Sequence, residues 1–447
     1  MSPNDRPNDT NLRPGGPSAA ARAGESAGVA LVVENIGVLA TPRGDAAHGG
    51  AELGAIDVDE RGGLVLVADA AGRIAAVGTP DEIGPTPTDA PRLDAGGGLV
   101  VPGLVDPHTH PVFLGTRDEE FERRLRGESY VEIAAAGGGI RSSLAGVRGA
   151  SAEELLAALL VRLDRFLQLG TTTVEAKTGY GLTVADELKG LDVIRAARSS
   201  HDVDLVATCL GAHDVPPEYA GDADAYVEIV SKELWPLAVE HGAQYADVFT
   251  EAHTFDIEAS RRLMLAARDV GLTPRMHVDQ LTPLGGAELA AEVGAATADH
   301  LEHVSERGIE ALLGAGVQPV LCPLVPLFLR ETDEAPARRM VEAGLAPALS
   351  TDFNPGSCYC MSLFETMSWG ALRYGLSAAE ALTAVTLNAA CTLGLGADRG
   401  TLEVGKRADL VVTDLPGVRH LTYELGRSPV VATVKDGRVA YRAGGVR

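Results

Sequence analysis

Aromatic side chains are scarce in this sequence of 447 residues, cysteines are few, and long apolar runs are absent. Phe, Tyr and Trp make up 4% of the chain while Gly contributes 52 residues, a balance that suits many tight turns between strands and helices. No apolar run approaches the ~20 residues of a membrane-spanning helix, so we expect no membrane partner. The five cysteines are odd in number and scattered, and no signal-like stretch opens the chain. We therefore expect free thiols in a reducing cytoplasm.

Positive charge is also lacking. The chain carries 62 acidic and 38 basic residues, which gives a formal net charge of −24. Nucleic acids and anionic membranes need a basic face, so neither is expected as the main partner. An anionic small substrate would need an Arg or Lys placed locally at its site.

The residue pattern divides the chain into four segments. Residues 1–28 are rich in Pro, Gly and Ala without periodicity, which predicts a disordered tail. Residues 29–101 form short apolar runs between Gly and Asp turns, and residues 399–447 return to the same texture. We predict one small β-sandwich built from both chain ends, with residues 102–398 inserted into it.

In the inserted segment, helical patterns such as SAEELLAALLVRLDRFLQLG alternate with eight short apolar runs. This alternation predicts an α/β fold, a somewhat distorted TIM-type (β/α)8 barrel, although a doubly wound open sheet would use the same elements. The first run ends at His108, and the others are TTTVEAKTG, VDLVATCLGAH, YADVFTEAH, LTPRMHVDQL, ATADHLEHV, VQPVLCPLVP and APALSTDFNPG.

Two histidines close the first of these runs, in the stretch GLVVPGLVDPHTHPVF. Residues i and i+2 of a strand point to the same face, so His108 and His110 would project together and could share one ion. A His-x-His pair on a surface loop is the competing interpretation.

Further polar residues follow the later runs. In a parallel barrel the chemistry lies where strands end, and here stand His213, His277, His300 and Asp352. A lone histidine at such a place is often a hydrogen-bonded core residue. Three imidazoles and one carboxylate, however, suit a borderline divalent ion such as Zn²⁺, which lowers the pKa of a bound water to about 7. The predicted ligands are His108, His110, His277 and Asp352. The pair Cys358-x-Cys360 lacks the usual zinc spacing.

Several motifs resemble known proteins. The pattern Gly-Leu-Val-Asp-x-His-x-His, the closing Asp352 and GTLEVGKRADLVVTD at 400–414 resemble the metal-dependent amidohydrolase superfamily. Within it, HTHPVFLGTRDEEFERRLRGESYVEIAAAGGGI, TTTVEAKTGYGL, LGAHDVPPEY and ALSTDFNPGSCYC are similar to the imidazolonepropionase family, over nearly all of residues 30–445. The resemblance implies hydrolysis of 4-imidazolone-5-propanoate to N-formimidoyl-L-glutamate, one metal ion (Zn first, Fe compatible) and a homodimer.

The resemblance also implies roles for individual residues. Asp352 and His300 would act in proton transfer, and Arg117 would bind the propionate through the bidentate hydrogen bonds of its guanidinium. Without the family, Arg117 would be interpreted as a surface ion pair with Asp118 or Glu120. The implied substrate contacts are Arg117, Tyr180, His213, Gln280, Asn354, Gly356 and Ser357.

Three positions test the match to the family. Gln280 stands where some members carry Glu, so it can orient substrate or water but not accept a proton. Lys177 lies in the second run, not in the fourth, where related enzymes place a metal-bridging carboxylated lysine. Glu251 in the fourth run is a possible additional ligand. We therefore predict a site for one metal ion.

Two other functions share these features. Another cyclic amidohydrolase or a nucleobase deaminase would use the same metal ligands, and the loop motifs GGGI, KTGYGL and DFNPGS favour the imidazolonepropionase family over them. A non-enzymatic scaffold on the same barrel would be expected to lose ligands, yet ligand-competent residues occupy all the predicted positions.

Overall fold

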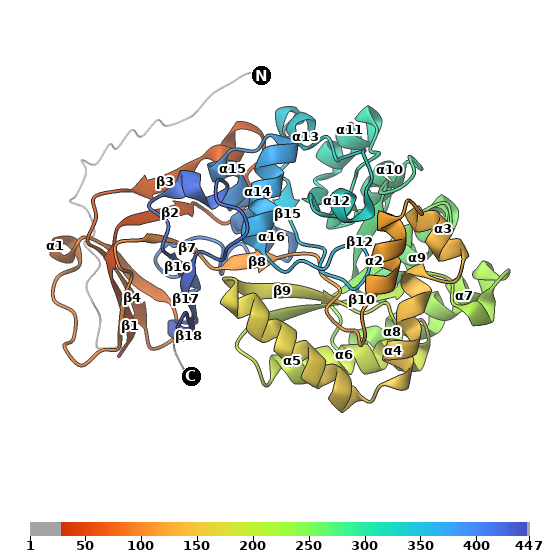
Figure 1. Ribbon diagram of the computed structural model, residues 1–447, viewed down its shortest axis with the longest axis horizontal. Helices are drawn as coiled ribbons and strands as arrows, with labels where there is room; N and C mark the ends of the chain where they lie inside the picture. Colours follow the sequence, from red (N-terminus) through yellow and green to blue (C-terminus); the bar gives the residue numbers. More distant parts are fainter. Residues whose placement is uncertain (1–27, 445–447) are drawn as a thin grey trace, which may run out of the picture.

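The computed structural model describes residues 28–444. Residues 1–27 and 445–447 lie outside the described residues, and with them all but one residue of the predicted tail. The chain forms a large sheet surrounded by helices, with two smaller sheets packed at one side of it (Figure 1).

The large sheet has eight strands in sequential order, and each neighbouring pair in this order is parallel. A doubly wound sheet would reverse its strand order, so this order excludes it and the predicted barrel is confirmed. The strands are β8 (Leu104–Asp106), β9 (Thr171–Lys177), β10 (Asp204–Ala212), β11 (Tyr245–Thr250), β12 (Thr273–Val278), β13 (Thr297–His300), β14 (Gln318–Leu321) and β15 (Ala348–Leu349).

The barrel closes loosely between its first and last strands. Among the described residues, β8 and β15 share no ladder; a single parallel bridge joins Thr109 to Phe353, and the His110 amide donates to the Phe353 carbonyl at 2.9 Å. The Ser350 hydroxyl adds bonds to Asp106 and to the His108 carbonyl. This irregular seam is the predicted distortion.

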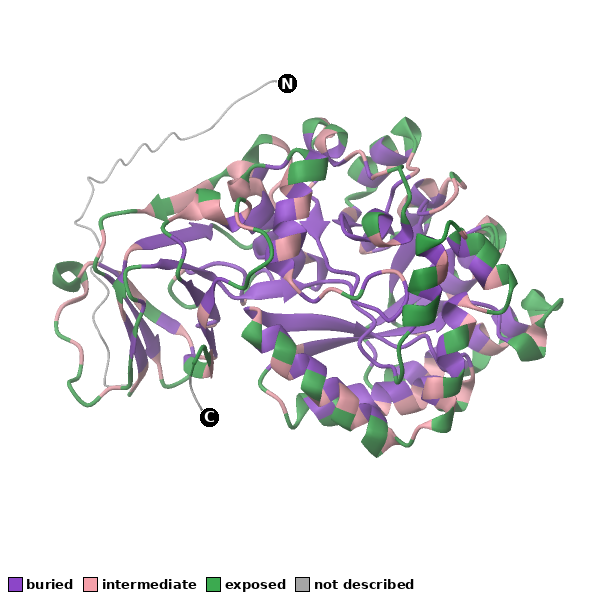
Figure 2. Ribbon diagram, viewed as in Figure 1, coloured by how far each residue is buried: buried purple, intermediate pink, exposed green. Residues whose placement is uncertain are grey.

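Helices cover the outside of the barrel, so the strands are buried on both faces (Figure 2). The 17-residue helix Ala152–Gln168, which precedes β9, begins with a capping box of Ser151 and Glu154 and buries leucines at helical spacing. The helices are α1 (Pro80–Ile83), α2 (Asp118–Leu125), α3 (Tyr130–Ala135), α4 (Leu144–Gly149), α5 (Ala152–Gln168), α6 (Val184–Arg198), α7 (Ala223–Ile229), α8 (Trp235–Glu240), α9 (Ile257–Asp269), α10 (Gly286–Val293), α11 (Glu306–Ala315), α12 (Val325–Leu329), α13 (Ala337–Ala343), α14 (Leu363–Tyr374), α15 (Ala378–Ala384) and α16 (Leu387–Thr392). None of these described helices has the length and apolar character that crossing a bilayer demands.

The two smaller sheets enclose a second core and use both ends of the chain, as predicted. The link between the ends is the antiparallel pairing of Leu99–Pro102 (β7) with Leu410–Thr413 (β16). The exact domain boundaries proposed from the sequence remain a prediction. The other strands are β1 (Val29–Ile36), β2 (Val38–Pro42), β3 (Ile56–Asp59), β4 (Leu64–Asp69), β5 (Ile74–Gly78), β6 (Arg92–Asp94), β17 (Val430–Lys435) and β18 (Arg438–Arg442).

Gly98 lies where the two chain ends meet, and we expect it to tolerate no side chain. A Cβ on Gly98 would stand 1.9 Å from the Thr413 carbonyl oxygen, and this contact is with backbone that cannot swing away. Gly98→Ala should lower the free energy of unfolding by about 2 kcal/mol, measured by urea unfolding followed by circular dichroism.

Gly314→Ala is the matched control, because nothing lies within 4 Å of its Cβ and it is exposed in α11. The control should be unchanged or up to about 1 kcal/mol more stable. Equal stability of both variants would contradict the clash.

One local prediction is wrong. The sequence places His108 and His110 on the strand, but β8 ends at Asp106 and both histidines lie in the segment that follows. Pro107 has no N–H to donate to a ladder, which explains why the strand stops there.

Candidate active site

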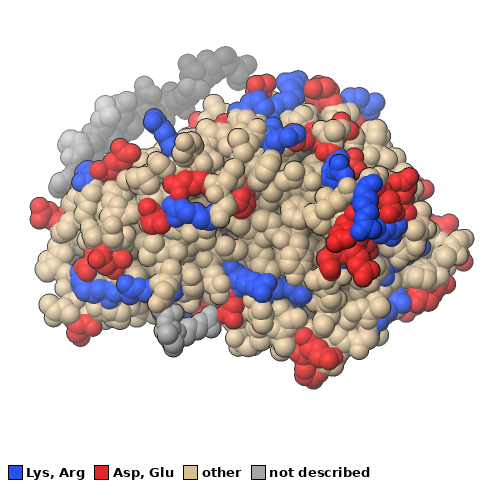
Figure 3. Space-filling model, in the orientation of Figure 1, with Lys and Arg blue, Asp and Glu red and all other residues tan. Residues whose placement is uncertain are grey.

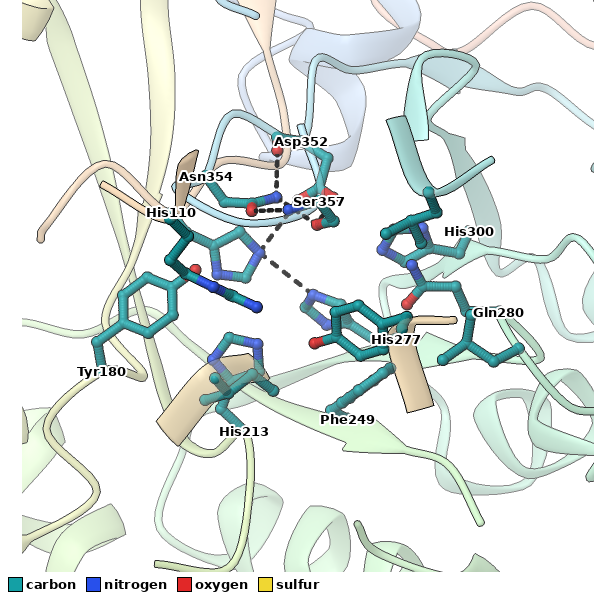
Figure 4. A pocket seen from close by; sticks show the side chains of 15 residues that line it. His110, Tyr180, His213, Phe249, His277, Gln280, His300, Asp352, Asn354 and Ser357 are labelled. Carbon is teal, nitrogen blue, oxygen red and sulfur yellow. Dashed lines mark hydrogen bonds and ion pairs between the residues drawn. The ribbon is translucent and has the colours of Figure 1, made fainter. Parts of the chain in front are cut away.

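The predicted metal ligands converge at the carboxyl end of the barrel, and all are buried. The Nε2 atom of His110 lies 3.3 Å from Nε2 of His108 and 3.4 Å from Nε2 of His277. Asp352 Oδ1 lies 3.2 Å from the same atom of His110 and 3.5 Å from Nε2 of His108. Ligand-type atoms from distant parts of the chain thus gather around His108 in two triads, one with His110 and His277 and one with His300 and Asp352. Figure 4 shows the rings of His110 and His277 turned toward each other.

Carboxylates behind two of the imidazoles orient them. Nδ1 of His108 lies 2.6 Å from Asp299 Oδ2, and Nδ1 of His277 lies 3.1 Å from Asp247 Oδ1. Burial raises the pKa of Asp299, but the charges of Arg275 and His108 hold it below its ordinary value, so this carboxylate accepts the Nδ1–H. Because Nδ1 of each of these two rings is engaged by a carboxylate, Nε2 is the nitrogen that faces the other predicted ligands.

This arrangement fits a metal ion. Lone pairs on neighbouring nitrogens repel unless a cation lies between them, and no single proton can satisfy all three Nε2 atoms. Burial lowers the pKa of His110, and lowers that of His277 to about 3, which keeps both rings neutral as ligands. Burial and Lys177 lower the pKa of His108, yet Asp299 and Asp352 raise it to about 9, so this ring differs from the other two and carries a proton that a bound metal ion would replace. Neutral imidazoles with one carboxylate are a donor set for Zn²⁺ or iron.

The backbone is strained where two of the predicted catalytic residues stand. His300 has φ 80° and Asp352 has φ 48°, a left-handed conformation that costs energy for residues other than Gly. The His300 ring lies 5.3 Å from the rings of both His108 and His277. Its Nδ1 lies 3.7 Å from Glu302 Oε1. The strain turns the His300 ring toward the metal ligands.

A small cavity opens from the metal ligands toward the loops. Its volume of about 30 Å³ holds a few waters at most. It is lined by nearly all the predicted substrate contacts and by residues that sequence reasoning missed, namely Tyr130, Ile140, Phe249, Leu281 and Leu329 (Figure 4). Tyr130 and Ile140 lie within the stretch quoted for the family resemblance, so only that resemblance could have drawn attention to them.

Arg117 brings positive charge to the cavity. It is buried and donates from Nε and Nη2 to Glu120 at 3.0 and 2.7 Å, so the ion pair considered from the sequence exists but is not on the surface. Glu120 also accepts bonds from the Gly139 amide and the Ser142 hydroxyl, which explains the GGGI motif. Gly356 leaves room for the guanidinium, because a Cβ there would lie 2.1 Å from Arg117 Nη1.

The helix that begins after Arg117 is covered with charges of both signs, which Figure 3 shows as a mixed red and blue patch over α2. Acidic and basic side chains are interspersed there, so the acidic excess does not form a single negative face around the guanidinium. The positive charge that faces the cavity is the buried one of Arg117.

Two further predicted contacts have the hydrogen-bonding capacity a polar substrate needs. Nδ1 of His213 lies 2.9 Å from the Gly179 carbonyl, and burial holds its pKa well below the ordinary value. The neutral ring donates Nδ1–H to that carbonyl and keeps Nε2 as an acceptor. Burial also raises the pKa of Tyr180, so its phenol remains a donor.

The loop after Asp352 is held by Asn354. The Asn354 side chain donates to the Asp352 carbonyl and to the Ser357 hydroxyl, both at 2.7 Å. Its Oδ1 accepts from the amides of Gly356 and Ser357. These bonds fix the DFNPGS motif beside Asp352.

Glu251 and Lys177 face other partners. Glu251 Oε1 accepts the backbone N–H groups of Gln280, Leu281 and Thr282, so this carboxylate holds the loop that carries Gln280. Lys177 Nζ lies 2.7 Å from Asp247 Oδ2 and 2.9 Å from Glu175 Oε1, the contacts of an ammonium.

Comparison with known proteins identifies the family. The family model "Amidohydrolase family" matches residues 133–441. The imidazolonepropionase of Porphyromonas gingivalis (strain ATCC BAA-308 / W83) is 42% identical over 414 residues, covering 92% of this chain and 97% of that protein. The imidazolonepropionase of Myxococcus xanthus (strain DK1622) is 47% identical over 375 residues, covering 83% of this chain and 89% of that protein. The chain belongs to the imidazolonepropionase family of amidohydrolases.

Solved structures support the same fold at lower identity. The 5-methylcytosine deaminase from Klebsiella pneumoniae liganded with 5-fluorocytosine has a TM-score of 0.68 at 18% identity, covering 93% of this chain and 98% of that one. E. coli guanine deaminase has a TM-score of 0.66 at 18% identity, covering 92% and 100%. Deaminases thus share the barrel, while the sequence relatives separate this chain from them and confirm the predicted family.

Proposed function

We propose that this chain hydrolyses 4-imidazolone-5-propanoate to N-formimidoyl-L-glutamate. One observation supports this most: the buried Arg117 and three of the predicted metal ligands, His110, His277 and Asp352, line the same small cavity. A substrate that carries both a carboxylate and a cyclic amide matches these two groups.

A single metal ion is proposed at His108, His110, His277 and Asp352, with Zn²⁺ favoured and iron compatible with the same donors. When bound, the ion would activate water and polarise the amide carbonyl. Coordination needs neutral imidazoles and an ionised carboxylate. Burial keeps His110 and His277 neutral, His108 and His110 keep Asp352 ionised, and the raised pKa of His108 means that the ion would displace a proton from this ring.

The proton chemistry is assigned to Asp352 and His300. Hydrolysis adds water across the C–N bond of the ring, so the carbon gains oxygen and the departing ring nitrogen gains a proton. Asp352 is buried at the cluster and positioned to take the proton of the water and return it to the nitrogen. His300, which also lines the cavity, would stabilise the charge that develops on the carbonyl oxygen. Gln280 orients the ring through its amide.

Substrate binding is assigned to Arg117 and to the polar side chains around the predicted metal ligands. Glu120 contacts the Nε and Nη2 atoms of Arg117, so Nη1 is left to contact the propionate. Tyr180 and His213 offer a donor and an acceptor to the ring, and Asn354, Gly356 and Ser357 shape the loop beside it. A homodimer and a cytoplasmic location remain predictions from the sequence.

The decisive experiment follows the absorbance of freshly generated imidazolonepropanoate with wild type and His110→Ala, with metal content measured on both. We expect rapid ring opening by wild type and loss of both metal and activity in the variant. A metal-loaded wild type that leaves this substrate unchanged would contradict the substrate and redirect the search to other cyclic amides.

A further inference from the structure

Strand β9 carries two charged residues that point into the barrel interior, Glu175 and Lys177, and both have fully buried side chains. Lys177 Nζ lies 2.9 Å from Glu175 Oε1, 2.7 Å from Asp247 Oδ2 and 3.9 Å from Asp299 Oδ2. Burying one ammonium among three carboxylates is costly unless the geometry is well ordered. The EAK sequence of β9 therefore needs an explanation that the proposed reaction does not supply.

The two aspartates that contact Lys177 are the same two that contact predicted metal ligands. Asp247 presents Oδ2 to Lys177 and Oδ1 to Nδ1 of His277 at 3.1 Å. Asp299 presents Oδ2 to Nδ1 of His108 at 2.6 Å and to Lys177. One ammonium thus connects to two histidines from distant parts of the chain, through one carboxylate each.

The same strand also holds the backbone between His108 and His110. The Thr109 amide donates to Glu175 Oε2 at 3.2 Å, the Thr109 hydroxyl donates to the Glu175 carbonyl at 2.6 Å, and the Lys177 amide donates to the Thr109 carbonyl at 3.0 Å. The backbone of the His-Thr-His segment and the ring of His108 are therefore fixed from one side.

A second buried cation completes the group. Arg275 Nη2 lies 3.8 Å from Asp299 Oδ2 and donates to the Pro107 carbonyl at 2.8 Å, while Nη1 donates to the Thr392 carbonyl at 3.0 Å. The group has three carboxylates and two cations, a net charge of −1 beside the metal position. In contrast, Nδ1 of His110 has no hydrogen-bond partner among residues 28–444.

We propose that Lys177, acting through Asp247 and Asp299, is a positioning residue of the metal centre. It holds the two carboxylates so that His277 and His108 present Nε2, rather than Nδ1, to the ion. Such partners behind histidine ligands commonly change metal affinity by 10–100-fold. This inference rests on the proposed metal centre, not on the identity of the substrate.

The test measures Zn²⁺ affinity directly, by competition with a chelator of known affinity, on wild type, Asp247→Asn, Asp299→Asn and Lys177→Met. Both Asp→Asn variants remove a negative charge and a hydrogen-bond acceptor that cannot also donate, so each should bind Zn²⁺ 10–100-fold more weakly. Lys177→Met separates two effects. If the ammonium positions the carboxylates, affinity falls by at least tenfold; if it merely repels the cation, affinity rises.

Glu187→Gln is the matched control, because Glu187 is an equally buried carboxylate that accepts the amides of Gly179, Gly181 and Leu182 and contacts no predicted ligand. Its Zn²⁺ affinity should stay within threefold of wild type. The absorption spectrum of the Co²⁺-substituted proteins reports the geometry of the metal ligands. A changed spectrum in the two aspartate variants would show that the histidines have moved. Circular dichroism of the metal-free proteins shows whether each variant is folded.

The outcomes distinguish this inference from the proposed function. Unchanged Zn²⁺ affinity in both aspartate variants, or tighter binding in Lys177→Met, would overturn the positioning role. A wild type that binds Zn²⁺ as expected but does not open the ring would overturn only the substrate. A variant that fails to fold is replaced by Asp299→Glu, which retains charge but shifts the carboxylate, and this variant should also lose at least tenfold in affinity.

Discussion

Asp352→Asn is expected to lower kcat by about 10³-fold while the protein still binds a metal ion. Asparagine keeps an oxygen near Nε2 of His108 and His110 but cannot accept a proton, and general-base catalysis typically contributes 10²–10⁴-fold. Steady-state ring opening followed by absorbance, with metal content by atomic emission, measures both properties on one sample.

The control for this variant is Asp333→Asn, the same chemical change at an exposed position away from the cavity. It should keep wild-type kcat and metal content. An Asp352→Asn protein that retains metal and more than a tenth of its kcat would assign the base to another residue. His300 would then be the next to test, because it lines the same cavity.

Arg117→Met should raise KM for imidazolonepropanoate about 100-fold and change kcat much less. Arg117 lines the same cavity as Asp352 but is paired with Glu120 and not with the predicted metal ligands, so we expect it to bind the carboxylate and not the reacting carbonyl. Methionine would leave Glu120 buried without its cation, and the double variant Arg117→Met with Glu120→Gln avoids that cost. The measurement is KM for the propanoate and for its propanamide analogue.

The wild type should prefer the propanoate strongly, and the double variant should bind both compounds almost equally. Gly356→Ala provides an independent perturbation, because its Cβ would occupy the space of Arg117 Nη1 without removing any charge. It should also raise KM for the propanoate by at least tenfold. If the preference for the carboxylate survives in the double variant, another group binds the propionate.

The barrel could be predicted because its signals are local. A helix such as α5 is recognisable from its capping box and its spaced leucines, and a buried strand such as β9 from a short apolar run. Eight such alternations in order leave few topologies, and the observed strand order is the expected one. The apolar pattern places the end of β8 too late, because the run stays apolar through Val105 while Pro107, which cannot donate to the ladder, ends the strand at Asp106.

The chemistry of the site depends on contacts that no local pattern shows. His108 and His277 are far apart in the chain, and only closure of the barrel brings their rings to a centroid distance of 4.4 Å. Arg117 has the sequence surroundings of a surface residue, yet the folded loops bury it against Glu120 and Gly356. Its role was suggested only by the family resemblance.

The order of strands and helices can be predicted from the amino-acid sequence alone, because hydrophobic periodicity and helix caps act over a few residues. The sequence also shows directly which residue types follow each strand. The tertiary structure alone decided which nitrogen of His108 and His277 faces the metal position, because that choice depends on Asp299 and Asp247 from other strands. It also decided that Lys177 serves these carboxylates, because three strands must align before one ammonium can reach them. The residue type limits the chemistry that a side chain can perform. The neighbours that barrel closure brings next to that side chain determine which part of this chemistry it performs.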